Sequence, residues 1–488
     1  MYCILNPNVA LRSWWLVPWA YYIKGNRNAI GLKKEEFDLL SLCDGKHDLE
    51  ETPLLTRFLS SGMVFAVSPD ENAELSPWQK RECDNRYFPA MNWMITGKCN
   101  YNCLHCFNAL DNAPLMSEFS LDEAERLLDE AEACGINAFT ITGGEPMAHK
   151  HFFAILESIY RRGMFVEELN TNGYYIDQTA LDRMSAIGCR PLIKISFDGI
   201  GHHDWLRNKK GAEEDALRAI RLCVKKRFRV KAQTNVHRWN LDSMLPTLKL
   251  LDSIGVEETR IIRTTEVPRW NQNAAGATLE LHEYFDEMLK LVSAYISEDC
   301  RMNLDIWQML TLFPKEKKYR IRSVECGIGE YRDSIPVCRG NRGMIAVAAN
   351  GNVFPCMQMS GYYEAKNDIL GNVKKEGLQP LLQAGRYLSE VCTTVGTLAQ
   401  KNEACGNCPY FKHCVGGCRA IALTLTGDKF GVDPSKCFFF KKGYVQKVEA
   451  SLEGWRNIAP IDQKNMGESI TVSYSDPNEN YITDNSHN

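Results

Sequence analysis

The chain has 488 residues, a length that predicts two to four domains. Its composition, 44% hydrophobic and 24% charged, is typical of a globular protein, and a net charge of −4 with a pI near 6.3 argues against a basic face for nucleic acid. The first ten residues lack the basic start and continuous apolar core of an export signal, so we expect a cytoplasmic location.

Residues 1–76 predict a small domain of strands and helices. The apolar stretch Ser13–Ile23 is broken by Pro18 and is shorter than the roughly 20 residues that cross a membrane, so it indicates a pair of buried strands. Apolar residues at helical spacing predict helices over 33–43 and 53–62, followed by a strand over 63–67. This order is typical of a winged helix. The polar residues 77–88 are expected to form a linker.

Strands and helices are predicted to alternate between residues 89 and 310. The strands are expected at 92–96, 138–142, 165–169, 192–197, 230–236 and 258–263, and the helices at 120–135, 151–162, 180–187, 213–226, 241–254 and 281–298. Six such βα units predict a parallel sheet, and we expect an α/β fold, an open (β/α)6 partial TIM barrel. Each polar motif follows a strand, at the edge where parallel barrels carry their sites.

One of these motifs is Cys99-x3-Cys103-x2-Cys106. Thiolates at such spacings hold soft metals or iron–sulfur clusters. Three thiolates on a 4Fe–4S cluster leave one iron open to a ligand. A zinc site is the alternative, but a structural zinc site usually has four protein ligands, and only His105, inside the motif itself, offers a fourth.

A second set of cysteines runs through residues 311–450. Its pattern is Cys338-x12-Gly351-x4-Cys356, then Cys405-x2-Cys408-x5-Cys414-x3-Cys418-x18-Cys437. Helical periodicity fades here, which predicts loops organised by metal, either further iron–sulfur clusters or a zinc ribbon. The polar residues 451–488 predict a disordered tail.

The first motif resembles the one that defines the radical S-adenosylmethionine (SAM) superfamily. The resemblance implies an open barrel and a 4Fe–4S cluster whose open iron binds SAM, with cleavage of SAM to a 5′-deoxyadenosyl radical that abstracts hydrogen from the substrate. It also implies SAM contacts from residues at the strand ends. These are Gly143, Gly144 and Glu145 of a GGE motif, then Ser196, Asp198 and Asn172, with Arg207 in a following loop. Strand-end capping is the alternative for Ser196 and Asp198, and a surface position for Arg207.

The second set resembles the SPASM extension of that superfamily. The resemblance implies a first auxiliary cluster on Cys338, Cys356 and Cys418 and a second on Cys405, Cys408, Cys414 and Cys437. Cys326 is the candidate fourth ligand of the first, and without it one auxiliary iron would be open. The expected cofactors are therefore SAM and three 4Fe–4S clusters.

The stretch over residues 32–45 (LKKEEFDLLSLCDG) resembles PqqD-like recognition elements for ribosomally made, post-translationally modified peptides (RiPPs). Such domains bind a leader peptide as an added strand at a sheet edge. A structural cap on the barrel is the alternative.

Together the resemblances imply an oxidoreductase that modifies a precursor peptide, most directly by joining a cysteine sulfur to carbon as a thioether. The alternatives are a carbon–carbon crosslinking cyclase, formylglycine formation as in anaerobic sulfatase maturases, and a non-catalytic iron–sulfur protein for electron transfer or sensing. The expected partners are the precursor peptide, held through its leader, and an electron donor such as flavodoxin or ferredoxin. We expect no nucleic acid and no membrane, and no residue is singled out as a general acid or base.

Overall fold

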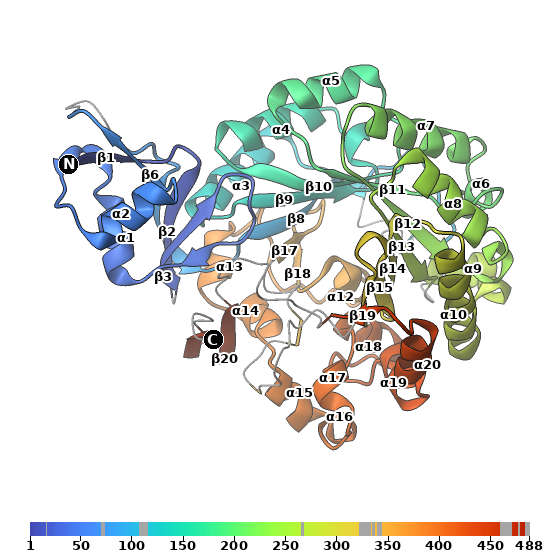
Figure 1. Ribbon diagram of the computed structural model, residues 1–488. Helices are drawn as coiled ribbons and strands as arrows, with labels where there is room; N and C mark the ends of the chain where they lie inside the picture. The colour runs from blue at the N-terminus through green and yellow to red at the C-terminus, as the bar shows by residue number, and fades with distance from the viewer. Residues whose placement is uncertain are drawn as a thin grey trace.

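A parallel sheet surrounded by helices organises the chain (Figure 1). The computed structural model describes residues 1–15, 17–69, 74–106, 116–264, 268–321, 333, 337–338, 344–458, 471–476 and 479–483. Cys326, the candidate fourth ligand of an auxiliary cluster, lies outside these residues. No helix in the described ranges is long and apolar enough to cross a membrane.

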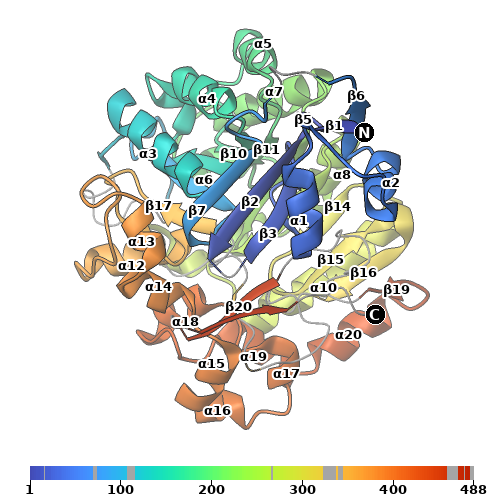
Figure 2. The ribbon, with the colours of Figure 1, turned by 90° about the vertical axis from the view of Figure 1, so that its left-hand side faces the viewer.

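Six parallel strands, paired in chain order, form the centre of the molecule. They are β8 (Ala90–Thr96), β9 (Ala138–Gly143), β10 (Phe165–Thr171), β11 (Leu192–Ser196), β12 (Val230–Val236) and β13 (Glu258–Arg263). The helices between them are α3 (Leu121–Ala133), α4 (Phe152–Arg161), α5 (Gln178–Ile187), α6 (His203–Arg207), α7 (Ala212–Lys225) and α8 (Met244–Ile254), with α9 (Pro268–Ala274) and α10 (Leu281–Ser297) after β13. Helices α3, α4, α5, α7, α8 and α10 cover the outside of the curved sheet (Figures 1 and 2), so the expected open six-unit barrel is confirmed.

Strand alternation determines which side chains face the barrel interior. In β11, Ile193 and Ile195 are fully buried in the core between sheet and helices. Lys194 and Ser196 point the other way and line an interior cavity, as expected when successive side chains of a strand alternate between its faces.

Strands from later in the chain extend the sheet at both edges. Beside β13 lies the parallel strand β14 (Asn303–Ile306), followed by the antiparallel β15 (Leu310–Phe313) and β16 (Lys318–Ile321). At the opposite edge β17 (Met344–Val347) pairs in parallel with β8 and antiparallel with β18 (Val353–Phe354). Because β17 belongs to the cysteine-rich region, backbone hydrogen bonds join that region to the barrel.

The cysteine-rich region is more helical than the sequence predicts. Its helices are α12 (Ser360–Ala365), α13 (Gln379–Gln383), α14 (Arg386–Val391), α15 (Val395–Lys401), α16 (Glu403–Gly406), α17 (Phe411–Cys414), α18 (Arg419–Thr426), α19 (Pro434–Lys441) and α20 (Tyr444–Ser451). The expectation of loops is wrong here because helices of four to eight residues are too short to repeat an apolar stripe.

The prediction of a disordered tail also needs correction. Strand β19 (Arg456–Asn457) pairs in parallel with β16, and β20 (Thr471–Asp476) forms an antiparallel pair with β21 (Glu479–Thr483). The sequences TVSYSD and ENYIT contain the β-branched and aromatic residues that favour strands, and this local signal outweighs the low overall apolar content.

The N-terminal residues form two small sheets and two helices. One sheet has the order β5-β1-β6, from Asp44–Asp48, Tyr2–Leu5 and Val64–Val67, and packs against α1 (Lys34–Ser41) and α2 (Pro53–Ser60). The other has the order β4-β3-β2-β7, from Ile30–Gly31, Val17–Ile23, Val9–Trp15 and Lys80–Arg86. The strand pair expected near Ser13–Ile23 is present as β2 and β3. The expected linker 77–88 contains β7, which pairs with β2 instead of connecting freely.

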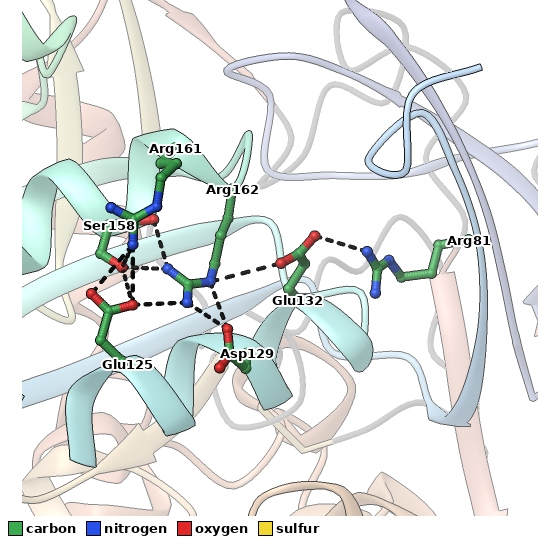
Figure 3. A network of polar contacts seen from close by, with 7 residues as sticks. All are labelled: Arg81, Glu125, Asp129, Glu132, Ser158, Arg161 and Arg162. Carbon is green, nitrogen blue, oxygen red and sulfur yellow. Dashed lines mark hydrogen bonds and ion pairs between the residues drawn. The ribbon is translucent and has the colours of Figure 1, made fainter. Parts of the chain in front are cut away.

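A network of ion pairs joins this second sheet to α3, and α3 to the end of α4 (Figure 3). Arg81 on β7 reaches Glu132 on α3 at 2.8 Å, and Arg162, which follows α4, pairs with Glu125 of α3 at 2.8 Å and approaches Glu132 at 3.7 Å. The indole nitrogen of Trp14 donates to the carbonyl of Cys134 at 2.8 Å. Buried and half-buried contacts of this kind hold the N-terminal region against α3.

Candidate functional site

The first cysteine motif lies in the loop that follows β8. Within it the amide of Tyr101 donates to Cys99 Sγ at 3.4 Å, and the amide of Cys106 donates to the carbonyl of Cys103 at 3.4 Å. The amide of Leu104 donates to the carbonyl of Leu206 at 2.9 Å, which fastens the loop to the end of α6. The barrel therefore holds this loop by its backbone.

All three motif cysteines line one cavity of about 810 Å³ at the carboxyl ends of the barrel strands. Cys338, Cys356 and Cys418 of the cysteine-rich region line the same cavity. Two cysteine sets that are more than 200 residues apart in the sequence thus face a single space.

The GGE segment packs closely against the end of β8, the strand that leads into the first motif. The amide of Gly144 donates to the Thr96 carbonyl at 2.8 Å. A Cβ on Gly143 would stand 2.4 Å from the Thr96 carbonyl oxygen, and one on Gly144 only 2.3 Å from that of Lys98. Both positions therefore require glycine. Both glycines line the cavity, as expected for residues that approach SAM through their backbone.

Glu145 does not line the cavity; its side chain is fully buried behind it. The carboxylate accepts hydrogen bonds from Thr171 Oγ1 at 2.8 Å, from the Asn172 amide at 2.8 Å and from the Met147 amide at 3.2 Å. Burial raises the pKa of Glu145 to about 7. These contacts fix the turn after β10, where Thr171 and Asn172 line the cavity.

Two further residues that the sequence singles out reach the cavity. Asn172 follows β10, donates through Nδ2 to Asn100 Oδ1 at 2.8 Å and accepts from the Tyr174 amide at 2.9 Å. Ser196 ends β11. Both line the cavity close to the cysteine motif, and a bound ligand could contact either.

Asp198 lies behind the cavity wall. It is fully buried and does not line the cavity, so its side chain is not placed to contact a ligand there. It accepts hydrogen bonds from Arg207 Nε at 2.7 Å and from the Asn235 amide at 2.9 Å, and His203 Nδ1 lies 3.0 Å from it. Burial alone would raise the pKa of Asp198, but Arg207 and His203 reverse this and hold it well below its usual range.

Arg207 is a buried component of the cavity wall, although the sequence left a surface position equally open. Its Nη1 lies 3.8 Å from Cys103 Sγ while Nε is held by Asp198. Burial would lower the pKa of Arg207, but Asp198 and Cys103 raise it, so the guanidinium stays charged. A fixed positive charge beside a cluster ligand stabilises the anionic form of a cluster.

The downstream cysteines separate into two groups. Cys418 interacts electrostatically with Cys356 and Cys338, whereas Cys405 interacts with Cys408 and Cys437, and Cys414 with Cys405 and Cys408. Only the first group faces the cavity. This grouping coincides with the assignment that the SPASM resemblance implies.

The donor set at both motifs consists mainly of cysteine sulfurs, and 4Fe–4S clusters take thiolates. Among the described residues, no three His, Cys, Asp or Glu side chains are arranged to hold one metal ion. His105 accepts from Asn235 Nδ2 at 3.1 Å, and burial lowers its pKa to about 3, so the ring is neutral.

The cavity residues that sequence reasoning missed include Lys194 on β11 and Arg260 on β13. The alternation of side chains along a strand could have identified Lys194, because it lies two residues before Ser196 and therefore on the same face. Arg260 is flanked by residues of alternating burial in β13 and donates through Nε to Asp305 Oδ2 at 2.6 Å.

Comparison with protein families supports both cysteine regions. Residues 93–251 match the Radical SAM superfamily, and residues 338–409 match SPASM, an iron–sulfur cluster-binding domain. The chain therefore carries a radical SAM domain and a SPASM domain, which imply SAM and 4Fe–4S clusters as cofactors. A PqqD-like family is not among these matches.

The relatives in sequence include enzymes of two kinds, heme synthases and peptide cyclases. An AdoMet-dependent heme synthase of Methanosarcina barkeri is 27% identical over 348 residues, 70% of this chain and 94% of the relative. A PqqA peptide cyclase of Granulibacter bethesdensis is 22% identical over 375 residues, 75% of this chain and 91% of the relative.

Solved structures share the fold. Streptococcus suis SuiB bound to its precursor peptide SuiA superposes with a TM-score of 0.63 at 14% identity, covering 89% of this chain and 99% of SuiB. Native anSMEcpe with bound AdoMet superposes with a TM-score of 0.55 at 18% identity, covering 74% of this chain and 98% of anSMEcpe. At these identities the likeness concerns the fold alone.

Proposed function

We propose that this radical SAM, SPASM-containing enzyme modifies a ribosomally made precursor peptide, most directly by forming a thioether between a cysteine sulfur and carbon. The observation that carries the proposal is the single cavity of about 810 Å³. It brings together Cys99, Cys103 and Cys106 from the barrel and Cys338, Cys356 and Cys418 from the SPASM region. A substrate in this space would meet both the radical source and an electron acceptor.

The barrel residues have distinct proposed roles. Cys99, Cys103 and Cys106 would hold a 4Fe–4S cluster, and the chemistry that it would supply when bound is reductive cleavage of SAM and hydrogen abstraction from the substrate. Gly143 and Gly144 let SAM approach the backbone, and Asn172 and Ser196 offer polar contacts. Arg207 supplies positive charge beside Cys103, and Asp198 and Glu145 hold these groups from behind.

The SPASM cysteines are proposed to hold two auxiliary clusters, which makes three 4Fe–4S clusters in all. Cys338, Cys356 and Cys418 ligate the first, with Cys326 as its fourth ligand. Cys405, Cys408, Cys414 and Cys437 ligate the second. Thioether formation needs such an acceptor, because removing one hydrogen atom from carbon and one proton from the thiol leaves one electron when the C–S bond forms.

The N-terminal residues 1–76 are proposed to bind the leader of the peptide. Strand β6 is an edge of its sheet, and Phe65 and Val67 on it are 46% and 38% exposed. An added strand would pair with this edge and cover both side chains. The reductant is proposed to be a flavodoxin or ferredoxin, in the cytoplasm.

A second candidate is tetrapyrrole chemistry, because AdoMet-dependent heme synthases are among the relatives in sequence. The structure of SuiB bound to its precursor peptide superposes over 89% of this chain, whereas the heme synthase alignment covers 70%, and this wider likeness in fold favours the peptide substrate. Carbon–carbon crosslinking and formylglycine formation are alternatives for the bond made.

The test is anaerobic turnover with iron- and sulfide-reconstituted enzyme, SAM, a reductant and synthetic peptides encoded by reading frames beside the gene. The expected result is 5′-deoxyadenosine together with a peptide that has lost two hydrogens and one alkylatable thiol per crosslink. Loss of hydrogens with all thiols still alkylatable would indicate a carbon–carbon bond. Turnover of coproporphyrin III but of no peptide would contradict the proposal.

A further inference from the structure

We propose that two buried charges, the carboxylate of Asp433 and the guanidinium of Arg419, set the reduction potentials of the two auxiliary clusters apart. Asp433 lowers the potential of the first cluster, whose ligands line the cavity, and Arg419 raises that of the second, whose ligands do not. The inference rests on the two-cluster assignment within the proposed function and adds to it the direction in which the electron leaves the cavity.

Asp433 is held against Cys418, a proposed ligand of the first auxiliary cluster. The amide of Cys418 donates to Asp433 Oδ2 at 2.7 Å, and Gln308 Nε2, from the turn after β14, donates to the same oxygen at 2.7 Å. The amide of Lys436 donates to Oδ1 at 3.1 Å, so Asp433 also caps α19. Asp433 is 1% exposed and forms no ion pair among the described residues, so these neutral donors leave its charge uncancelled.

The backbone before Cys418 packs directly on this carboxylate. Gly417 has a φ of +80°, and a Cβ on it would stand 2.4 Å from the Cβ of Asp433 and 2.5 Å from Oδ2. Only glycine lets a backbone pass this close to the side chain. Gly417 on one side and Gln308 on the other therefore fix the charge beside the ligand.

Arg419, in the first turn of α18, is a buried cation held by carbonyl groups. Nη1 donates to the carbonyls of Lys429 and Gly431 at 2.9 and 2.8 Å, and Nη2 donates to that of Gly416. In the part of the chain that the structure describes, Arg419 forms no ion pair. Its positive charge is therefore balanced there by carbonyl dipoles alone.

The two charges act on ligands of different clusters. Among charged groups, Asp433 has the largest effect on Cys418, and it disfavours the thiolate. Arg419 has the largest effect on Cys405, and it favours the thiolate. A charge that disfavours a thiolate also disfavours the extra electron of a reduced cluster on that thiolate, because both add negative charge at the same place. The first cluster should therefore be harder to reduce than the second.

This difference gives the electron a direction. When the C–S bond forms, the carbon has lost one hydrogen atom and the thiol one proton, and the remaining electron reduces the first auxiliary cluster. Its transfer to the second cluster reoxidises the first and reduces the second, and an oxidised flavodoxin or ferredoxin then removes it. Because only the first group of cysteines lines the cavity, this order carries the electron away from the substrate.

The direct test is a redox titration of the reconstituted full chain, followed by EPR. The signal lost in Cys103→Ala belongs to the SAM-binding cluster, and the one lost in Cys356→Ala to the first auxiliary cluster, which we expect to have the lower potential of the auxiliary pair. Asp433→Asn should raise that potential, and Arg419→Gln should lower the potential of the second cluster. We expect each change to shift the reduction equilibrium about tenfold, which is about 59 mV for one electron.

Matched variants separate charge from structure. Arg419→Lys keeps the charge and should keep the potential of the second cluster. Asp433→Ser, which can still cap α19, is the second variant if Asp433→Asn does not fold. Asp428→Asn, at an exposed carboxylate in the loop before α19, and Arg386→Gln, at an exposed arginine of α14, should change neither potential.

The outcomes separate this inference from the function on which it rests. A first auxiliary cluster with the higher potential, or an unchanged potential in either charge-removing variant, would overturn the inference and leave peptide modification intact. Equal shifts in the control variants would overturn it as well. Zinc or a single cluster in the SPASM region would contradict the two-cluster assignment itself.

Discussion

The two cysteine-bearing regions are built in different ways. The loop of the first motif is fastened to the barrel backbone, with Leu104 bonded to Leu206, and Asp198 orients Arg207 against Cys103. Five cysteines of the SPASM region lie on or beside helices of four to eight residues, namely Cys405, Cys408, Cys414, Cys418 and Cys437. Isolated helices of that length are unstable, so we infer that the first site is preorganised by its scaffold and the second depends on its clusters for order.

The largest expected effect comes from removing a ligand of the first motif. Cys103→Ala should abolish formation of 5′-deoxyadenosine, because the SAM-binding cluster loses one of three ligands. The iron content should fall by one cluster while the SPASM region keeps its own. Cys300→Ala, outside both motifs and nearly buried, should retain activity and all iron. Activity in Cys103→Ala above that of a no-enzyme control would contradict the assignment.

Removing all clusters tests whether the SPASM region depends on metal for its order more than the barrel does. After chelation of iron, amide hydrogen exchange should become fast over residues 395–441 and stay slow in β9 to β12. The reason is that the barrel strands have a continuous ladder and a large buried apolar core, whereas helices α15 to α17 share only a small apolar cluster and so depend more on their cysteine ligands for order. Equal loss of protection in both regions would show that the barrel also depends on metal.

Arg207 and Asp198 test the preorganisation of the first site. Arg207→Gln removes the charged contact of Arg207 with Cys103. We expect this loss to weaken SAM binding about 30-fold, since a hydrogen bond involving a charged group contributes about 2 kcal/mol. Asp198→Asn should cause a smaller loss because the guanidinium keeps its charge but loses its fixed orientation. Equilibrium dialysis with labelled SAM measures both. The double variant should resemble Arg207→Gln alone; additive losses would mean that Asp198 acts independently of Arg207.

Glu145 is expected to have the smallest effect on SAM binding, and its effect on stability depends on pH. Its pKa rises from 4.5 to about 7 on burial, so between these values the folded protein binds a proton that the unfolded chain has released. Stability relative to Glu145→Gln should therefore be greatest below pH 4.5, fall by at most about 3 kcal/mol as the pH rises to 7, and stay constant above. Thermal unfolding of both proteins at several pH values provides the measurement. A stability difference between them that does not change with pH would contradict the raised pKa.

The barrel was predictable from sequence because its strands and helices are long enough to repeat a pattern. The strands β12 and β13 begin and end where the sequence predicts. Helix α3 begins within one residue of its predicted start, where Ser120 caps it and Glu123 returns the hydrogen bond at 2.8 Å. The short helices of the SPASM region and the hairpin of β20 and β21 were missed because each depends on one or two turns or on tertiary contacts.

The candidate ligands were predictable from sequence, but which residues line the cavity and which lie behind its wall was not. Spacing identified the cysteines, and the GGE motif identified the two glycines, because both signals lie within a few residues of sequence. It could not show that Glu145 and Asp198 lie behind the cavity wall, because strand ends place neighbouring residues on opposite sides of the chain. Nor could it show that Arg207 packs against Cys103, which is 104 residues away.

Transfer of deuterium from a peptide to 5′-deoxyadenosine tests the central claim most directly. The measurement uses reconstituted enzyme, SAM, a reductant and a synthetic precursor peptide deuterated at its carbon atoms, with coproporphyrin III deuterated in the same way as the comparison. The account predicts that deuterium from the peptide appears in 5′-deoxyadenosine and that Cys103→Ala gives none. Label from the macrocycle, with none from any peptide, would contradict it.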